Sequence, residues 1–299
     1  QILGELLLDL KSTLPIKNYQ RILRLDQATA FTSFKRGDNH IQQIAFADFK
    51  NDLIWIRITA SQPLDIDISL HRKENATTSY KSNKITLSGV LPNENTEGMQ
   101  FASVIDVQTD GNLQNTTNAT SIQKAKEIVL KISAATNYNF TKGGLTQNDV
   151  LQKANDYLQK ATISFNKAII ESQKAYQVLF NRNRWYSEAN TDTSSLSTFE
   201  RLQRFYKGKK DALLPILYYN FGRYLLISSS REGLLPANLQ GLWAEEYQTP
   251  WNGDYHLNIN LQMNYWLAES TNLSELTTPL HQFTKNLVAN GRKTARAYY

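Results

Sequence analysis

The sequence predicts a multidomain protein in which β-strands come first and helices follow. Apolar and polar residues alternate with a period of two from Leu64 to Leu70, which is typical of a strand with one buried face. Residues 146–184 contain no Gly and no Pro, and their apolar residues recur at helical spacing. From residue 196 onward, the start and stop signals are those of helices. The predicted order is an antiparallel β-sandwich, a helical linker and an all-helical region.

The predicted β-sandwich covers residues 1–142. Strand-like runs follow one another there with turn residues, and no helical pattern, between them. One run places Ile54, Ile56 and Ile58 on one face and Trp55 and Arg57 on the other. Further runs are Leu6–Leu10, Ile41–Phe49, Ile85–Val90, Phe101–Thr109 and Glu127–Ala134. Turns are expected at residues 35–39, 92–95 and 110–112, and the N-terminal strands of the sandwich are expected to be missing from this sequence.

Helices are predicted from residue 143 onward. The linker covers residues 143–195 as one or two helices and ends in a polar loop at 187–195. A capping box at Ser197 and Glu200 opens the next helix, and Gly208 ends it. Further helices are predicted over residues 211–226, 261–268 and 279–291, and another is expected to begin at 292. The all-helical region therefore covers residues 196–299.

The composition excludes several classes of protein and site. The formal charge is +6, but the Lys and Arg residues are scattered and form no sustained basic stripe for a nucleic acid. The chain has no Cys, which excludes disulfides, thiolate metal sites and a Cys nucleophile. No apolar run reaches the roughly 18–20 residues of a membrane span. The sequence predicts no metal and no cofactor, and it does not set the oligomeric state.

The stretch from Leu234 to Trp266 has the composition of a carbohydrate cleft. It combines Asn, Gln and His with three of the five Trp residues, whereas linking loops are rich in Gly, Ser and Pro. Amides both donate and accept hydrogen bonds, as sugar hydroxyls require, and indole rings stack on the apolar face of a pyranose. Any one of these Trp residues is equally consistent with core packing, but the cluster favours a sugar site. The candidate sugar-binding residues are His256, Trp243, Asn238, Gln262 and Trp251.

Spacing adds a geometric prediction at the end of this stretch. His256, Asn258 and Asn260 stand two residues apart. Residues two apart diverge on a helix but share one side of an extended backbone. We therefore predict extended backbone up to about Asn260, with a helix starting just after it and the three side chains directed at one ligand.

Carboxylates near this stretch leave the catalytic pair open. Most glycosidases use two carboxylates. The nearby candidates are Asp254, Glu245, Glu246 and Glu269. Spacing alone favours Asp254, although a turn or cap role after Gly253 explains this residue equally well.

Three segments resemble the signature of glycoside hydrolase family 95: Phe221–Arg231, Leu235–Trp243 and Asp254–Trp266. The similarity is dense from Arg201 to Arg296 and weaker over the β region. It implies a β-sandwich, a helical linker, an (α/α)6 barrel and a C-terminal β domain, so residues 196–299 are expected to be the first helices of an incomplete barrel. It also implies hydrolysis of terminal α-1,2-linked L-fucose with inversion, or of L-galactosides as in some members.

The resemblance also implies roles for individual residues. Asn260 matches the residue that activates the attacking water, and Asn258 matches its partner. An amide is not basic near neutral pH, so a downstream Asp must polarise it or take the proton onward. His256 resembles the residue that contacts the sugar. The general acid Glu and the backing Asp are expected beyond Tyr299, in a longer gene product, so the chain alone is expected to be inactive.

Two other functions fit the same sequence. One is a non-catalytic carbohydrate-binding module that kept the fold. The other is an unrelated helical-barrel enzyme, such as a trehalase-like or maltose-phosphorylase-like protein, which would need a different motif. The partner of a fucosidase is a fucosylated oligosaccharide or glycan. Because such glycans are extracellular, the resemblance implies a secreted or periplasmic bacterial protein.

Overall fold

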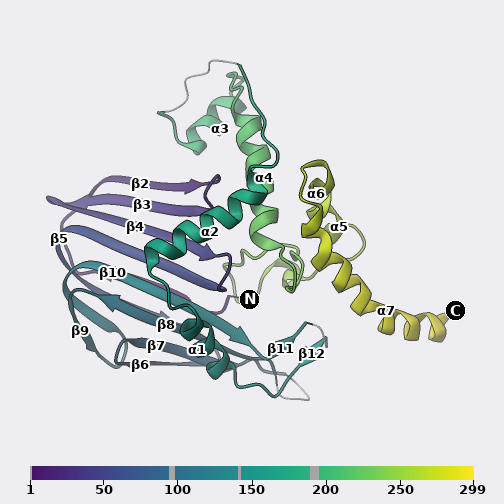
Figure 1. The fold of residues 1–299 in the computed structure, drawn as a ribbon, viewed down its shortest axis with the longest axis horizontal. Coiled ribbons are helices and arrows are strands. Elements are labelled where there is room, and N and C mark those ends of the chain that lie inside the picture. Colours follow the sequence, from purple (N-terminus) through teal and green to yellow (C-terminus); the bar gives the residue numbers. More distant parts are fainter. Residues whose placement is uncertain (1, 94–97, 141–142, 189–194) are drawn as a thin grey trace. The chain divides into compact units, whose positions relative to one another are not determined.

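The computed structural model describes residues 2–93, 98–140, 143–188 and 195–299 (Figure 1). The chain forms two compact units. The strand unit consists of Gln1–Tyr176 and Ala244–Thr249, and the helical unit of Gln177–Trp243 and Pro250–Tyr299. An antiparallel sheet followed by helices is thus confirmed, while the division into three domains at residues 142 and 195 stays a prediction. Within the described ranges, no helix has both the length and the apolarity needed to cross a bilayer.

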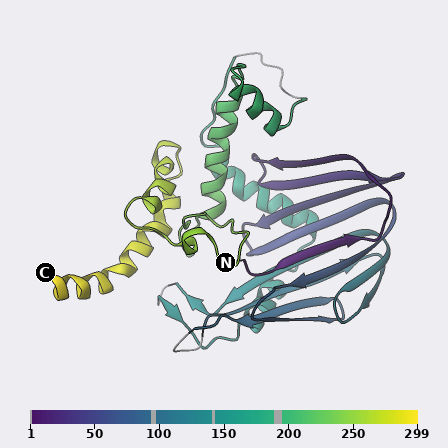
Figure 2. The same ribbon diagram turned by 180° about the vertical axis from the view of Figure 1, so that it is seen from behind.

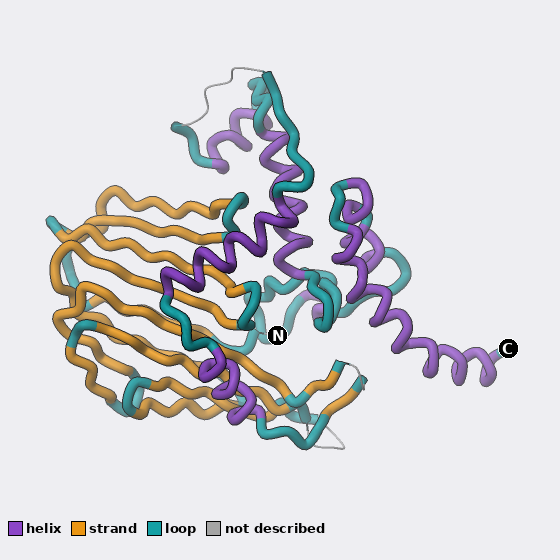
Figure 3. The backbone as a smooth tube through the Cα atoms, viewed as in Figure 1, coloured by secondary structure: helices purple, strands orange, loops and turns teal. Residues whose placement is uncertain are grey.

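Ten strands of the described residues form one antiparallel sheet (Figure 3). They are β1 (Glu5–Leu10), β2 (Ile16–Arg24), β3 (Thr29–Arg36), β4 (Asn39–Asp48), β5 (Leu53–His71), β6 (Ala76–Lys81), β7 (Lys84–Val90), β8 (Gln100–Thr109), β9 (Asn112–Asn115) and β10 (Thr120–Thr136). The strand order is β2-β3-β4-β5-β10-β8-β7-β6, with β1 paired to β5 and β9 to β10. Two short strands, β11 (Tyr138–Asn139) and β12 (Gly144–Leu145), pair separately. The ladder is therefore continuous from β2 to β6.

The long strand β5 changes its partner halfway along. It pairs with β4 through Leu53–Ala60 and with β1 through Ile66–His71. Pro63 lies between the two stretches and has no N–H to give to a ladder. Across the sheet, β10 shifts register on both sides of Ala125, and Lys124 has a φ of 56°. These irregularities allow both strands to bend, as bulges do.

The main core is lined by the inward residues of the bent strands. Ile66 and Ile68 are at most 1% exposed, whereas Asp65, which precedes Ile66, faces solvent. The alternation predicted from the sequence is therefore confirmed. Strand β6, which is not a ladder neighbour of β5, also contacts it, because the Tyr80 hydroxyl donates to the Leu70 carbonyl at 3.3 Å.

The helices are α1 (Val150–Lys160), α2 (Phe165–Phe180), α3 (Thr198–Tyr206), α4 (Leu214–Ser229), α5 (Asn260–Tyr265), α6 (Leu267–Ser270) and α7 (Thr278–Tyr298), with 3-10 turns η1 (Pro250–Gly253) and η2 (Ser274–Thr277). In the strand unit, α1 and the first turns of α2 cover one face of the sheet; seen from behind, the strands lie in front of them (Figure 2). Residues 146–184 therefore form two helices.

The helix-covered face of the sheet holds a second core around Trp55. This side chain is 1% exposed, stacks on Phe46 and meets Phe165 of α2 edge-on. Its indole N–H donates to Asp48 at 3.2 Å. Ile54, on the opposite face of β5, is 49% exposed. The face that carries Trp55 is thus buried here because the helices cover it.

Four strands of the large sheet were not predicted from the sequence, namely β2, β3, β6 and β9, and neither were the short strands β11 and β12. Every residue of β2 is exposed, so burial imposes no alternation on it. It stands at one end of the strand order, where only one neighbour is needed. Strands of this kind are specified by pairing rather than by a hydrophobic pattern. The predicted turn at 92–95 lies partly outside the described residues, as does most of the loop at 187–195.

The helical unit confirms one predicted helix start and corrects two helix ends. The Ser197 side chain accepts from the Glu200 N–H, and the Glu200 carboxylate accepts from the Ser197 N–H, which completes the capping box. The predicted helix over 261–268 is two short helices that meet at Trp266. The predicted end at Gly291 is wrong, because α7 continues to Tyr298. An interior Gly costs a helix only about 1 kcal/mol, and the flanking Lys, Arg and Ala residues favour helix.

Asp211 connects α3 to the start of α4. Its carboxylate accepts two hydrogen bonds from Arg201, at 2.8 and 2.9 Å. The same carboxylate accepts from the N–H groups of Leu213 and Leu214, both at 3.1 Å, at the first turn of α4. The hydrogen bonds from Arg201 hold the pKa of the Asp211 carboxyl below its ordinary value. The ionised form is therefore the one that the fold stabilises.

Acid is expected to weaken the helical unit through Asp211. The pKa of Asp211 in the folded state lies below the unfolded value of about 3.9. Its contribution to the stability of the folded state is therefore present above about pH 4 and is lost as the pH falls through the folded pKa. Replacing Asp211 by Asn is expected to lower the free energy of unfolding by about 1.5–3 kcal/mol at neutral pH. It is also expected to reduce the loss of stability that the wild type shows as the pH falls below 4. Urea unfolding followed by circular dichroism at pH 7 and pH 3 measures both effects. Glu232→Gln, at an exposed carboxylate, is the control; equal pH dependence in Asp211→Asn and the wild type would contradict this role.

Candidate active site

The Asn238–Gly241 turn opens the candidate segment. The N–H of each of these two residues donates to the carbonyl of the other, at 3.3 and 3.0 Å. The Asn238 side-chain oxygen accepts from the Gln240 N–H at 2.8 Å. Gly241 has a φ of +68°, and a Cβ there would lie 2.5 Å from the Trp243 ring. The turn therefore needs Gly at 241, and it sets the position of the indole of Trp243, which is 46% exposed.

Two residues that the sequence analysis did not single out attach this turn to α5. The Asn264 amide donates to the Asn238 carbonyl at 2.8 Å and to the Ala237 carbonyl at 3.4 Å. The Tyr265 hydroxyl accepts from the Ala237 N–H at 3.0 Å. Helix α5 begins at Asn260, so the same six-residue helix carries a predicted catalytic residue and the anchor of the loop.

Tyr265 is also the centre of a directed chain of hydrogen bonds. Its hydroxyl lies 2.8 Å from the Ser230 hydroxyl, and Ser230 donates to the Leu276 carbonyl at 2.7 Å. Since the Ser230 proton is used there, Tyr265 must donate to Ser230 while it accepts from Ala237. Burial raises the pKa of the Tyr265 hydroxyl, so it stays protonated as this chain requires. The signal for this role in the sequence was the position of Tyr265, four residues after Leu261. Both residues lie on the buried face of α5, where a hydroxyl group needs a hydrogen-bond partner.

Removing the Tyr265 hydroxyl is expected to loosen the loop. Tyr265→Phe keeps the ring but leaves the buried Ala237 N–H without its acceptor, which is expected to cost about 1–3 kcal/mol of unfolding free energy. Urea unfolding of Tyr265→Phe beside Tyr218→Phe, whose ring is 80% exposed, measures the difference. Equal midpoints for the two variants would show that the chain of hydrogen bonds adds no stability.

The predicted extended approach to α5 is wrong. His256 has a φ of +45°, residues 257–259 form a turn, and the Leu261 N–H donates to the His256 carbonyl at 3.3 Å. Ile259 has a φ of −176° but a ψ of −36°, which is not strand geometry. The hydrogen-bonded turn into the helix overrides the two-residue spacing. Asn260 is therefore the first residue of α5, and Asn258 belongs to the preceding turn.

Backbone strain gathers just before this turn. Trp251 and Asn252 have φ angles of 48° and 57°, followed by Gly253 at 62°, and His256 lies only three residues further on. A non-Gly residue in the left-handed region costs about 1–3 kcal/mol, and such residues cluster at functional sites. The Asp254 carbonyl accepts from the Leu239 N–H at 3.1 Å, which joins the strained segment to the first turn.

The predicted site side chains are largely open to solvent. Asn258 is exposed and Asn260 and His256 are half-buried, and within the described ranges the two Asn amides form no hydrogen bond. Trp251 is 72% exposed. Gln262 is exposed, and its amide donates to the Leu257 carbonyl at 2.7 Å, so it also closes the turn. Both Asn amides thus keep their full hydrogen-bonding capacity for water or a ligand.

In the part of the chain that the structure describes, no three His, Cys, Asp or Glu side chains are placed to hold a metal ion. Asp254 is exposed, and its N–H donates to the Trp251 carbonyl at 3.1 Å. Its backbone therefore takes part in the turn after Gly253.

Comparison with known proteins places the segment in a family. A model of the glycosyl hydrolase family 95 catalytic domain matches residues 164–299, and a model of the glycosyl hydrolase family 65 N-terminal domain matches residues 1–141. A protein of Arabidopsis thaliana named "Alpha-L-fucosidase 2" is 32% identical over 100% of this chain and 40% of its own length. A protein of Aspergillus niger named "Probable alpha-fucosidase A" is 33% identical over the same shares.

The chain corresponds to only part of each relative. The chain spans about 40% of the length of the two relatives. A bacterial glucoamylase of known structure aligns with 96% of this chain and 45% of its own chain at 12% identity, with a TM-score of 0.48. Residues 164–299 thus match the catalytic domain of glycosyl hydrolase family 95, and two relatives that align with the whole chain are named as fucosidases.

Proposed function

We propose that the protein is a glycoside hydrolase that removes terminal α-linked, chiefly α-1,2-linked, L-fucose from glycans with inversion. The observation that carries the proposal is the pair of open amides at Asn258 and Asn260, on a loop and helix that Asn264 and Tyr265 hold together. The names of the two fucosidase relatives support the choice of sugar. A fucosylated oligosaccharide is the proposed substrate, and export to the periplasm or the medium is part of the proposal because such glycans are extracellular.

The proposed chemistry is a single displacement by water. The water oxygen attacks the anomeric carbon of fucose while the bond from that carbon to the leaving oxygen breaks. Asn260 orients the water through its carbonyl oxygen, with Asn258 assisting, and the proton of the water passes on to a carboxylate. The leaving oxygen takes a proton from a carboxylic acid, as in inverting glycosidases.

The proposed reaction needs two carboxylates that lie outside the segment Leu234–Trp266. An amide alone cannot act as a base near neutral pH. We propose that an Asp that polarises Asn260, and the general acid Glu, come from parts of the protein that follow Tyr299. We further propose that α3 to α7 are the first helices of an (α/α)6 barrel. A glycan-binding protein without hydrolysis is the competing reading if those carboxylates are lacking.

Release of fucose by the intact protein tests the proposal. The substrate is a 2′-fucosylated oligosaccharide, and the matched compounds are its 3-fucosylated isomer and an α-L-galactosyl analogue. The expected result is free L-fucose, fastest from the 2′-linked compound. Faster release from the galactosyl analogue would assign an α-L-galactosidase, and binding without release would assign a binding module.

His256 is expected to contribute to the choice between the two sugars. L-Fucose carries a methyl group where L-galactose carries a hydroxymethyl group, and the half-buried His256 offers bulk at the turn before Asn258. His256→Thr is expected to raise the galactoside-to-fucoside ratio of kcat/KM by about 10-fold, which is typical for one small group in a pocket. Rates on the two matched substrates measure it, and an unchanged ratio would remove His256 from this role.

A further inference from the structure

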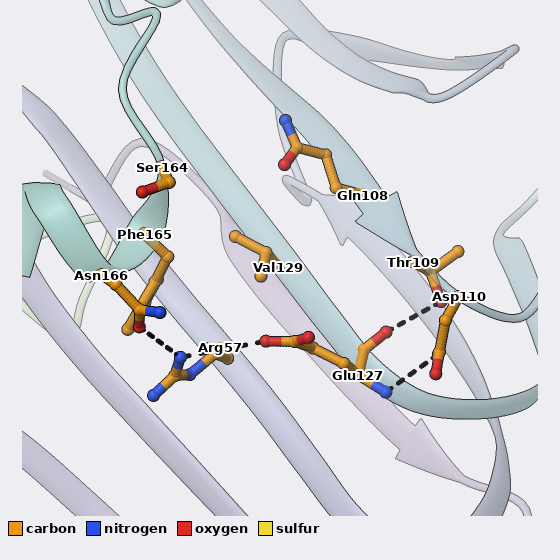
Figure 4. A pocket seen from close by; sticks show the side chains of 9 residues that line it. All are labelled: Arg57, Gln108, Thr109, Asp110, Glu127, Val129, Ser164, Phe165 and Asn166. Atoms are coloured by element: carbon orange, nitrogen blue, oxygen red, sulfur yellow. Dashed lines mark hydrogen bonds and ion pairs between the residues drawn. The ribbon is translucent and has the colours of Figure 1, made fainter.

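A hollow of about 340 Å³ lies on the strand unit, and none of the residues that line it belongs to the segment Leu234–Trp266 (Figure 4). Its floor is Val129 of β10, which is 9% exposed. One side comes from Ser164 and Phe165 at the start of α2, and the other from Thr109, the last residue of β8, and Asp110 just after it. Its size is at the lower end of the roughly 300–1,000 Å³ of small-molecule sites, so it suits a single sugar-sized ligand.

A loose ion pair at the edge of the hollow leaves hydrogen-bonding capacity unused. Arg57 and Glu127 are 3.9 Å apart, which is too far for a hydrogen bond. The Arg57 guanidinium is fixed in place, because it donates to the Asn166 side-chain oxygen at 2.7 Å and lies 4.3 Å from the centre of the Phe165 ring. The Glu127 side chain is 53% exposed, so its oxygens are open to a ligand.

The opposite side of the hollow is held by the backbone. The Asp110 carboxylate accepts from the N–H groups of Lys126 and Glu127, both at 2.9 Å, and the Thr109 hydroxyl donates to the Glu127 carbonyl at 3.1 Å. The N–H of Glu127 and then that of Lys126 hold the pKa of the Asp110 carboxyl below its ordinary value. Gln108 donates to Asp106 at 3.1 Å through one N–H, which leaves its amide oxygen for a ligand.

The charges and polarity of the hollow select a class of ligand. One guanidinium faces two carboxylates, so an anionic ligand such as a phosphate is disfavoured. Neighbouring hydroxyl groups of a sugar can accept from Arg57 and donate to Glu127, because each hydroxyl does both. The apolar floor at Val129 suits the C–H groups of the ring.

We propose that this hollow is a second carbohydrate-binding site, specific for a neutral sugar ring with adjacent free hydroxyl groups. The choice of a sugar over another neutral polyol rests on the proposed function, whereas the hollow itself does not depend on catalysis. A glycan bound at the strand unit would raise the local concentration of its fucosylated ends.

Binding without turnover tests the second site. The intact protein carrying Asn260→Ala is titrated with a 2′-fucosylated oligosaccharide, with its unfucosylated core and with L-fucose, by isothermal calorimetry. Two binding events are expected for at least one of these probes. Adding Glu127→Gln, or in a separate variant Arg57→Ala, is expected to weaken one event at least about tenfold and to leave the other unchanged.

The controls separate this site from the active site and from misfolding. Glu171→Gln removes a matched loose pair with Lys50, at 3.6 Å on the same unit, and is expected to change neither event. Glu127→Gln alters only an exposed side chain, so it decides the matter if Arg57→Ala unfolds. A single event, or two events that neither variant weakens, would overturn the second site even if fucose is released. Two events with no fucose release by the wild type would overturn the hydrolase and leave the second site standing.

Discussion

Replacing Asn260 by Ala is expected to lower kcat for fucose release by the intact protein by about 10²–10⁴-fold, the range for loss of a general base. Asn260 is the first residue of α5, it is half-buried, and its amide forms no hydrogen bond within the described residues. Its removal therefore breaks no hydrogen bond among the described residues, and the expected loss is in the chemical step. KM is expected to change little, since the water and not the sugar loses its partner.

Two measurements keep the Asn260 result interpretable. Asn290→Ala, at an exposed position of α7, is the matched control and is expected to keep full activity. Asn258→Ala is expected to fall between the two, because Asn258 assists and Asn260 carries the main role. Full activity of Asn260→Ala, with Asn258→Ala strongly impaired, would reverse the two roles. Full activity of both variants would remove the amides from the mechanism.

Replacing Arg223 by Met is expected to cost about 3–5 kcal/mol of unfolding free energy, the range for breaking a buried charged network. Arg223 is 0% exposed, although it carries a full charge. Its guanidinium donates to the carbonyls of Phe180 at 2.6 Å, Leu179 at 3.0 Å and Asn183 at 3.0 Å, at and just after the end of α2, and to Thr271 after α6 at 3.3 Å. Helix ends leave such carbonyls without partners, and a cation there is favoured by the helix dipole.

The midpoint of urea unfolding, followed by circular dichroism, measures the effect at Arg223. Arg223→Lys keeps the charge but not the planar fork, so it is expected to lie between wild type and Arg223→Met. Arg204→Met, at an exposed position of α3, is expected to stay within about 0.5 kcal/mol of wild type. A midpoint for Arg223→Met equal to that of Arg204→Met would show that the four carbonyls do not depend on the guanidinium.

Local signals in the sequence predicted the parts of the fold that are set locally. The capping box at Ser197 and Glu200 needs only four consecutive residues, and it forms as predicted. The alternation from Leu64 to Leu70 reports burial directly, because each second residue faces the core. The strand β2 is exposed at every residue, so burial imposes no alternating pattern on its sequence. This strand forms through its pairing with β3.

The backbone of the candidate site could not be predicted from the spacing of its residues. The spacing of His256, Asn258 and Asn260 suggested extended chain, yet the φ of +45° at His256 starts a turn instead. The His256 carbonyl accepts from the Leu261 N–H in this turn, and the two-residue spacing of the side chains does not report such a hydrogen bond. Tyr265 was missed for a related reason: its partners Ala237 and Ser230 are 28 and 35 residues away.

The anomeric form of the first product tests the central claim most directly. The intact protein is mixed with a 2′-fucosylated oligosaccharide, and proton NMR spectra are collected before the free sugar equilibrates. Direct attack by a water held at Asn260 predicts that β-L-fucose appears first from the α-linked substrate and that α-L-fucose follows only by mutarotation. Initial release of α-L-fucose, or no release of fucose, would contradict the account.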